Sequence, residues 1–375
     1  MNTVDAPIKL KVPFVDFKRR YSLHRDEILS AVDTVFSSGS YILGDFVEAF
    51  EDAIGQYLDC PYVLGVANGT DAIILGLKAF GVGPGDEVII PVNSFIASAG
   101  AVAAVGATPI FCDVTDDLNV DVNQISTLIT KNTKAIMPVH LTGRPADMQP
   151  IMALAKEHNL KVIEDAAQSI GASYHGQMTG TIGDMGTFSL HPLKNLYAYG
   201  DAGIITTRDK DLYNQLKLTR NHGLINRDTC ACWGLNSRLD SVQAKLALIG
   251  LRHLDEWTAR RRKTAKCYQD DLNTLLKVPF DHDQCSSVYH NFVALTERRD
   301  ALMQYLQQQG IETKIHYPIP MHLQPAAKSL GYKKGDFPVA ERLVNEMISL
   351  PVYSELNDEQ VQYVVHHVKQ FFQGR

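Results

Sequence analysis

The residue with the most distinctive chemistry in this sequence is a lysine between a predicted strand and a glycine-containing turn. Lys194 follows the predicted strand 185–189 and precedes residues 200–203 (Gly-Asp-Ala-Gly). Rigid backbone on both sides would fix the position of its amine. Enclosure beside apolar or cationic groups lowers the pKa of a lysine, and a neutral amine can form a Schiff base with a carbonyl. An isolated lysine is usually a solvated surface residue, but this context favours a nucleophilic one.

A carboxylate follows another apolar run. Asp165 lies in residues 164–168 (Glu-Asp-Ala-Ala-Gln), directly after the run 161–164. Ligands of open α/β sheets gather at the carboxyl ends of the strands. A carboxylate is costly to bury there unless it has a cationic partner, and a pyridinium nitrogen would be such a partner. The alternative is an aspartate that only caps the next helix.

Two motifs are suited to an anion. Residues 68–71 (Asn-Gly-Thr-Asp) follow a strand and open a helix, so Gly69 would let the backbone approach closely while the helix N-terminus offers free N–H groups. Thr70 adds a hydroxyl, and Ser189 ends the strand before the lysine, where it could donate to a phosphate. The alternative for residues 68–71 is an ordinary turn with a capped helix.

The second anion motif is residues 234–240 (Gly-Leu-Asn-Ser-Arg-Leu-Asp). It places the amide of Asn236 near the guanidinium of Arg238, a combination suited to phosphate or carboxylate. The alternative is a loop held together by an internal pair between Arg238 and Asp240.

The elements that would position these residues alternate along the chain from about residue 60. Strand, helix, strand repeated this often predicts an α/β fold with a large, mostly parallel sheet flanked by helices. The predicted strands are 62–66, 87–92, 108–112, 135–139, 161–164, 185–189 and 203–207, and the predicted helices between them are 71–80, 96–105 and 148–158.

The flanking segments suggest a second, smaller unit. Helices at 23–37 and 46–57 precede the sheet, and 243–271 reads as one long helix or two. The basic run 260–263 on it is typical of a solvated helix face. Beyond it we predict a strand at 288–295 and helices at 299–308 and 340–349. The predicted domains are therefore residues 1–240, the N-terminal segment and large domain, and residues 241–375, a small C-terminal α+β domain.

The composition narrows the class of protein. The chain has 375 residues, 45% hydrophobic and 21% charged, with a net charge of -6, so no broad basic field favours nucleic acid or anionic lipid. No apolar run approaches the roughly 20 residues of a membrane-spanning helix. Six scattered cysteines are typical of a reduced compartment. We expect a cytoplasmic protein without a membrane or nucleic-acid partner. Cys230 and Cys232 lack a second ligand pair, so we expect no metal site.

With these motifs in this order, the sequence resembles the DegT/DnrJ/StrS sugar aminotransferases, a branch of the fold-type-I pyridoxal-phosphate enzymes. The resemblance runs nearly end to end. It is carried by residues 12–16, 38–44, 68–72, 164–168, 191–196, 316–318 and 350–351. It implies a fold-type-I transferase with a seven-stranded sheet and pyridoxal 5′-phosphate as the cofactor.

The resemblance also implies roles for the residues. Lys194 would be the Schiff-base lysine that also moves the proton, and Asp165 would hold the pyridine nitrogen protonated. Gln168 would touch the phenolic oxygen of the ring, and Phe95 would stack on the ring. The implied phosphate ligands are Gly69, Thr70, Ser189 and, from the neighbouring subunit of a homodimer with shared active sites, Asn236.

The implied reaction moves an amino group from L-glutamate, the usual donor in this family, to a keto or aldehyde sugar, with ping-pong kinetics. Its product would be an amino sugar for lipopolysaccharide or another surface glycan. Relatives that act on nucleotide-linked 3-keto sugars carry Lys-Tyr and then His before the Gly-x-Asn-Ser-Arg element. This chain has residues 225–233 (Ile-Asn-Arg-Asp-Thr-Cys-Ala-Cys-Trp) there.

That departure leaves two substrate classes open, a nucleotide-linked keto-deoxy sugar and a free acidic sugar, the 8-oxo form of 3-deoxy-manno-octulosonate. An arginine fork suits a carboxylate. The candidate substrate contacts are Arg220, Arg227, Arg238, His316 and His322.

Two other functions fit the motifs less well. A pyridoxal-phosphate-dependent sugar dehydratase of this family would have histidine in place of Lys194 or an added iron–sulfur motif. A cofactor-binding regulator without activity would be expected to lose Lys194 or Asp165, and this chain has both.

Overall fold

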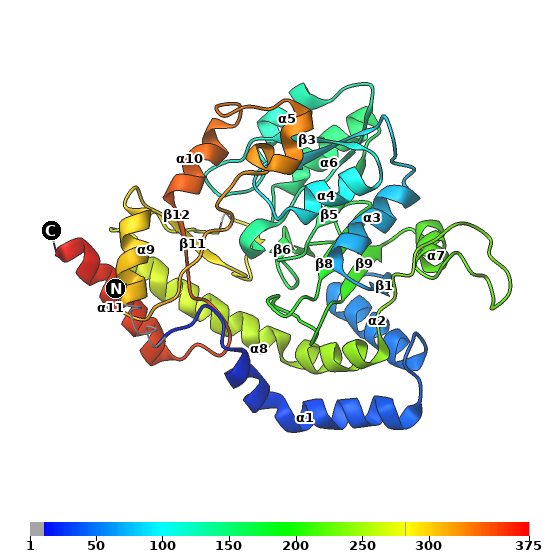
Figure 1. Ribbon diagram of the computed structural model, residues 1–375, viewed down its shortest axis with the longest axis horizontal. Helices are drawn as coiled ribbons and strands as arrows, with labels where there is room; N and C mark the ends of the chain where they lie inside the picture. Colours follow the sequence, from blue (N-terminus) through cyan, green and yellow to red (C-terminus); the bar gives the residue numbers. More distant parts are fainter. Residues whose placement is uncertain (1–10, 282, 375) are drawn as a thin grey trace, which may run out of the picture.

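The computed structural model describes residues 11–281 and 283–374. Its centre is a seven-stranded sheet with the order β1-β9-β8-β5-β4-β2-β3 (Figure 1). β9 is antiparallel to both of its neighbours, and every other pair in this sheet is parallel, which confirms the mostly parallel sheet. The strands are β1 (Tyr62–Val66), β2 (Glu87–Pro91), β3 (Thr108–Cys112), β4 (Thr133–Ile136), β5 (Lys161–Asp165), β8 (Met185–Ser189) and β9 (Gly203–Thr207).

Helices cover both faces of this sheet, so its strands are buried on both sides. In β5, Ile163 faces the core that contains residues of α3 and α4, whereas Val162 faces the core that contains residues of α5 and α6. These strands therefore read as continuous apolar runs without polar alternation. The helices are α3 (Gly69–Ala79), α4 (Ala97–Ala104), α5 (Val122–Leu128), α6 (Met148–His158) and α7 (Lys210–Thr219).

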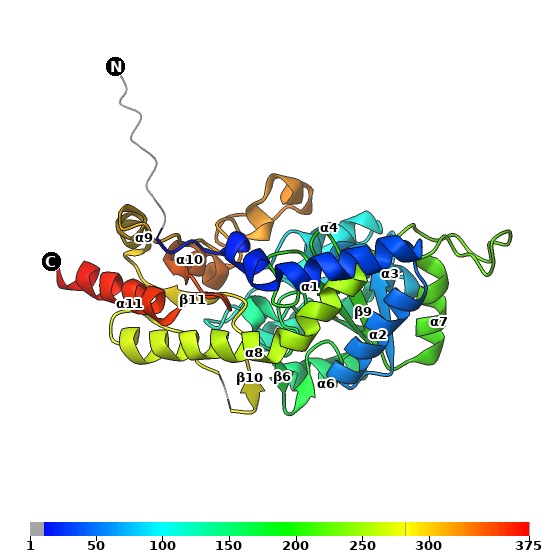
Figure 2. The same cartoon turned by 90° about the horizontal axis from the view of Figure 1, so that it is seen from below.

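Three helices form a layer along one side of the molecule. They are α1 (Phe17–Ser38), α2 (Asp45–Leu58) and α8 (Ser241–Leu272). The segment 243–271 is thus part of one helix, 32 residues long, which spans most of the molecule in both views (Figures 1 and 2). Ile28 and Ala31 of α1 pack on Leu246 and Ile249 of α8. None of the helices in the described residues is long and apolar enough to cross a membrane.

A second core lies at the C-terminal end of α8. Tyr268 and Leu272 of α8 pack there with residues of a two-stranded sheet and of two helices, and Val12 closes the cluster. The elements of this region are β11 (Phe292–Leu295), β12 (Met347–Leu350), α9 (Arg299–Gln308), α10 (Pro338–Glu346) and α11 (Asp358–Gln373). The short elements elsewhere are β6 (Ser173–Tyr174), β7 (Gln177–Met178), β10 (Cys285–Ser286), η1 (Leu141–Gly143), η2 (Met321–Leu323) and η3 (Pro325–Leu330).

Two predictions about this region were wrong. The helix expected at 340–349 ends at Glu346, because the following residues pair antiparallel with β11 as strand β12. The basic run 260–263 was expected to form a solvated helix face, but Arg261 within this run is only 3% exposed. Arg261 donates hydrogen bonds to the carbonyls of Val352 (2.7 Å) and Tyr289 (3.2 Å). Its charge therefore satisfies loop carbonyls that would otherwise be buried without partners.

Candidate active site

A cavity of about 620 Å³ lies at the edge of the large sheet where β5 and β8 end. It brings together residues from the start of α3, the loop before α4, the ends of β5 and β8, and the loop after α9. Seven of the predicted cofactor residues line it: Gly69, Thr70, Phe95, Asp165, Gln168, Ser189 and Lys194. His290, His316 and Tyr317 complete the wall that faces them.

One end of the cavity is suited to an anion. Asn68 caps α3, because its side chain accepts a hydrogen bond from the N–H of Asp71 at 2.8 Å. The N–H groups of Gly69 and Thr70 have no hydrogen-bond partner among the described residues. A Cβ atom at Gly69 would lie 2.9 Å from Cβ of Ser189, so only glycine permits this close contact. The helix cap, which was the alternative for this motif, is therefore present, and it leaves two N–H groups that could bind an anion.

Lys194 is held beside this end of the cavity. Burial lowers the pKa of its amine to about 8, and the nearby negative charge of Asp165 opposes that shift. A lysine with this pKa is neutral in a much larger fraction of molecules near neutral pH than a solvated one. The role of Lys194 as the nucleophilic amine stays a prediction, and this lowered pKa favours it.

Asp165 is 6% exposed and ends β5. Its Oδ2 accepts a hydrogen bond from the hydroxyl of Ser98 (2.8 Å), and its Oδ1 accepts one from the N–H of Ala167 (3.2 Å). No Lys, Arg or His of the described chain forms an ion pair with this carboxylate. Because a buried carboxylate needs a cationic partner, the site has room for one supplied by a ligand.

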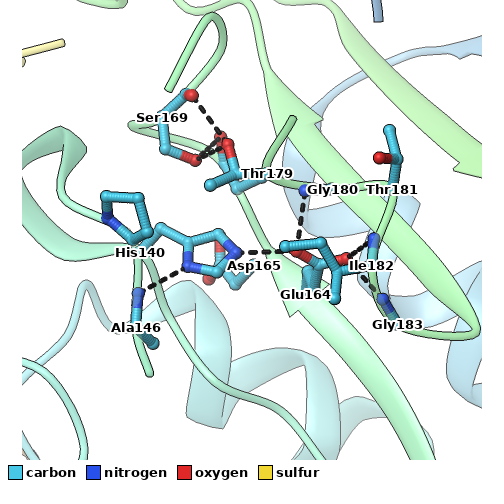
Figure 3. A network of polar contacts seen from close by, with 12 residues as sticks. His140, Ala146, Glu164, Asp165, Ser169, Thr179, Gly180, Thr181, Ile182 and Gly183 are labelled. Carbon is cyan, nitrogen blue, oxygen red and sulfur yellow. Dashed lines mark hydrogen bonds and ion pairs between the residues drawn. The ribbon is translucent and has the colours of Figure 1, made fainter. Parts of the chain in front are cut away.

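The strand end that carries Asp165 is anchored from the opposite face of the sheet (Figure 3). The fully buried carboxylate of Glu164 accepts hydrogen bonds from the N–H groups of Gly180, Ile182 and Gly183 at 2.7–2.8 Å. It also contacts Nε2 of His140 at 2.9 Å. Nδ1 of His140 accepts from a backbone N–H, so Nε2 carries the proton and donates to Glu164. This network fixes the backbone from which Asp165 projects.

The side chain of Gln168 has a defined orientation. Its Oε1 accepts from the N–H of Thr142 (2.8 Å), and its Nε2 donates to the hydroxyl of Tyr317 (3.2 Å). The amide therefore presents a donor to the cavity. The ring of Phe95 lies 5.7 Å from that of Tyr317 and is 51% exposed, so one ring face is free for a planar ligand.

Burial disfavours the charged form of two histidines that line the cavity opposite Lys194. Burial, with the nearby charge of Lys194, lowers the pKa of His316 to about 4 and that of His290 well below its usual value. Nδ1 of His290 lies 3.3 Å from Oδ1 of Asn195, whose Nδ2 donates to a backbone carbonyl. Among the candidate substrate contacts, His316 is the one that lines the cavity.

Two candidate substrate contacts lie elsewhere. Arg220 is 4% exposed and forms a buried ion pair with Glu51, which also accepts from the N–H of Gly65 (2.8 Å). His322 is 3% exposed, and its Nε2 lies 3.0 Å from Oε1 of Glu341. Neither side chain lines the cavity, because each is committed to a partner inside the fold. We therefore do not propose either as a substrate contact.

The remaining candidates are on a segment that projects from the body between α7 and α8 (Figures 1 and 2). We call residues 221–236 the arm; its ends pair as an antiparallel bridge between Asn221 and Asn236. Asn236 and Arg227 are exposed. Arg238, just after the arm, donates to Oδ1 of Asn221 (3.0 Å) rather than to Asp240 as the alternative expected. None of these three lines the cavity of its own chain.

Together these features match pyridoxal 5′-phosphate. The start of α3 is suited to the phosphate of this cofactor, the amine of Lys194 to its aldehyde, and the carboxylate of Asp165 to its ring nitrogen. The amide of Gln168 could donate a hydrogen bond to the phenolic oxygen, and the ring of Phe95 could stack on the cofactor ring. The sequence analysis did not predict Ser98 or Tyr317, which come to the site from other elements. The spacing of Ser94 and Ser98 by four residues near the start of a helix was the one available signal for the serine.

Comparison with known proteins agrees with this site. Residues 23–369 match the model of the DegT/DnrJ/EryC1/StrS aminotransferase family. A pleiotropic regulatory protein of Geobacillus stearothermophilus is 43% identical in sequence, and the match covers 97% of this chain and 99% of that protein. UDP-N-acetyl-3-dehydro-alpha-D-glucosamine 3-aminotransferase of Acidithiobacillus ferrooxidans is 41% identical over 97% of this chain and 98% of its own.

Solved structures give the same result. S. venezuelae DesV in complex with a ketimine intermediate superposes with a TM-score of 0.94 at 39% identity, covering 98% of this chain and 99% of that one. NtdA from Bacillus subtilis with bound pyridoxamine phosphate superposes with a TM-score of 0.90 at 32% identity, covering 99% of this chain and 87% of that one. The chain therefore belongs to the DegT/DnrJ/EryC1/StrS family and is a fold-type-I, pyridoxal-phosphate-dependent sugar aminotransferase.

Proposed function

We propose that this enzyme transfers the amino group of L-glutamate to a nucleotide-linked keto sugar, as a homodimer with shared active sites, in the synthesis of an amino sugar for a surface glycan. The observation that carries the proposal is the cavity in which Lys194, with a pKa lowered to about 8, faces Asp165 beside the start of α3. When bound, the cofactor ring supplies an electron sink for the carbon that loses or gains a proton.

The residues of the chain then have separate tasks. Lys194 holds the cofactor. Once its amine is free, Lys194 moves a proton on and off the reacting carbon, because a neutral amine can accept that proton. Asp165 keeps the ring nitrogen protonated, and Gln168 donates to the phenolic oxygen. Gly69, Thr70 and Ser189 bind the phosphate, while Phe95 covers one face of the ring.

The cavity of one chain has little positive charge to bind the phosphate of the cofactor. Lys194 is the single Lys or Arg among the described residues that line the cavity, although the phosphate carries about two negative charges. The arm, in contrast, exposes apolar side chains: Trp233 is 95% and Ile225 61% exposed. Exposed aromatic and aliphatic groups on a projecting segment favour a protein contact. We propose that the arm of a second copy brings Asn236, with Arg227 or Arg238, to this cavity.

The homodimer also accounts for apolar groups on α1. Phe17, Leu23 and Phe36 are 47–60% exposed along this helix. Exposed apolar side chains on a surface helix are typical of a protein contact, which a second copy of the chain would supply.

For the substrate, the relatives favour a sugar carried on a nucleotide. Several of them have names that specify UDP-linked or dTDP-linked sugars, and one of these, from Pseudomonas aeruginosa, is an aminotransferase for a UDP-linked glucuronate. The commitment of Arg220 to Glu51 removes one of the arginines that would bind a free acidic sugar. An acidic group on a nucleotide-linked sugar would still suit Arg227 on the arm or Arg238 just after it.

The test is to record the visible absorption of the cofactor-loaded enzyme before and after L-glutamate is added. We expect the band of the lysine-bound cofactor to be replaced by that of the amine form, with one 2-oxoglutarate released per site. The loaded amine form is then mixed with UDP-linked and dTDP-linked 3-keto sugars and with 8-oxo-3-deoxy-manno-octulosonate. Return of the original band with a nucleotide-linked sugar supports the proposal. Return with the free acidic sugar alone would refute the substrate class.

A further inference from the structure

The carboxylate of Asp165 is held in place by the hydroxyl of a buried serine, Ser98. Ser98, in the first turn of α4, is fully buried, and its hydroxyl donates to Oδ2 of Asp165 at 2.8 Å. Ser98 does not line the cavity, so it reaches a ligand only through Asp165. Since the N–H of Ala167 donates to Oδ1, both carboxylate oxygens have a donor and the plane of the carboxylate is fixed.

The hydroxyl of Ser98 is itself supported. The hydroxyl of Ser94 lies 2.8 Å from that of Ser98, and Ser94 is 4% exposed. Ser98 has one proton, which it gives to the carboxylate, so the proton between the two serines comes from Ser94. Two hydroxyls thus point in one direction and end on Asp165, an arrangement in which each hydrogen bond polarises the next.

We propose that Ser98, supported by Ser94, is a positioning residue that holds the Asp165 carboxylate in the orientation that pairs with the protonated ring nitrogen. This inference rests on the role proposed above for Asp165. Without the Ser98 hydroxyl, the carboxylate loses the donor on Oδ2 and can rotate about its Cβ–Cγ bond. Its hydrogen bond to the ring nitrogen then weakens, although Asp165 itself is unchanged.

The test measures how tightly the apoenzyme binds two ligands. One is pyridoxal 5′-phosphate, and the other is its 1-deaza analogue, which has carbon in place of the ring nitrogen and cannot pair with Asp165. We expect Ser98→Ala to weaken binding of pyridoxal 5′-phosphate about five-fold, the usual size of one such hydrogen bond, and to leave the analogue within about two-fold of wild type. Ser94→Ala should give a smaller loss with the same selectivity, and Ser98→Thr should recover most of the affinity.

Ser169 provides the matched control. It is also fully buried, four residues after Asp165, but its hydroxyl bonds to Thr179. Ser169→Ala should therefore leave the ratio of the two affinities unchanged. In an Asp165→Ala background, Ser98→Ala should have no further effect on either ligand, because the group it positions is gone.

The outcomes separate the two proposals. If wild type binds both ligands equally well, Asp165 does not pair with the ring nitrogen and the role proposed for it fails. If wild type prefers pyridoxal 5′-phosphate and Ser98→Ala keeps the full preference, the positioning role alone is overturned. A loss of equal size for both ligands in Ser98→Ala would also overturn it, because that pattern means a general loosening of the cavity.

Discussion

The N–H of Thr142 donates to Oε1 of Gln168 at 2.8 Å, which leaves the amide nitrogen of Gln168 as the group that faces Tyr317 and the cavity. A loop between β4 and α6 thereby decides that this side chain acts as a donor. A carboxylate in the same place would keep the bond to Thr142 and present a second acceptor instead.

Gln168→Glu should therefore bind pyridoxal 5′-phosphate about ten-fold more weakly, because a carboxylate would face the phenolic oxygen of the ring. Gln168→Ala should lose less, since it removes a donor without adding a charge. Equilibrium titration of the apoenzymes measures both. Equal losses in the two variants would mean that the amide orientation plays no part in cofactor binding.

The buried pair of Arg220 and Glu51 should matter for stability rather than for substrate. Burial raises the pKa of Glu51 and Arg220 opposes that shift, so Arg220→Ala leaves an unpaired buried carboxyl. We expect a loss of about 3 kcal/mol in the free energy of unfolding by urea, with an unchanged KM for the sugar.

Arg227→Ala is the control for that variant. Arg227 is exposed on the arm, so its removal should change the free energy of unfolding by less than about 0.5 kcal/mol. Its KM for the sugar should rise if the arm meets the substrate. A raised KM in Arg220→Ala at full folding would return Arg220 to the list of substrate contacts.

The regular elements could be predicted from the sequence because their signals are local. β3, β8, β9, α6 and α9 begin and end at the predicted residues. The helix expected at 340–349 failed because its apolar spacing continues past Glu346, while the pairing of Met347–Leu350 with β11 is a contact between distant parts of the chain. The prediction of a solvated face at Arg261 was wrong for the same reason, because the carbonyl groups that bind its side chain come from distant loops.

The residues of the candidate site also divide into those with a local sequence signal and those that depend on distant contacts. Residues within strand-end motifs, such as Lys194 and Asp165, were predicted because each motif sits at the edge of one element. Ser98 lies 67 residues before Asp165, and Tyr317 lies 149 residues after Gln168. The spacing of Ser94 and Ser98 is a local signal, but it does not show which distant residue Ser98 contacts, and Tyr317 has no such signal. Arg220 was misplaced because sequence gives the type of a side chain but not the direction in which the fold points it.

The lowered pKa of Lys194 predicts how cofactor capture depends on pH. Below about pH 8 the amine is protonated and unreactive, and above it the amine is neutral, so the rate of reconstitution with pyridoxal 5′-phosphate should rise with a midpoint near 8. A solvated lysine would give a midpoint at ~10.4. Stopped-flow absorbance of the apoenzyme from pH 6 to 10 measures this. A midpoint above 10 would mean that the amine is solvated.

The same shift predicts the pH dependence of apoenzyme stability. Between the folded pKa of about 8 and the unfolded value of ~10.4, the unfolded chain binds the extra proton. Stability should therefore rise with pH across this window in wild type relative to Lys194→Met, which has no amine to titrate. Parallel curves for the two proteins by urea unfolding would contradict the lowered pKa.

The shared active site can be tested with hybrid dimers. Lys194→Ala and Asn236→Ala should each be nearly inactive if the lysine and the amide of one site come from different chains. A mixture refolded at equal amounts contains hybrids with one intact site, so activity should recover to about a quarter of wild type. Recovery of none would place both residues in the site of a single chain.

The most direct test of the whole account is to locate the cofactor on the chain. The loaded enzyme is reduced with borohydride, digested and mapped by mass spectrometry, with and without prior addition of L-glutamate. The account predicts a pyridoxyl phosphate label on Lys194 that is lost after L-glutamate, because the amino group displaces the lysine. A label on another lysine, or one on Lys194 that no amino donor removes, would contradict it.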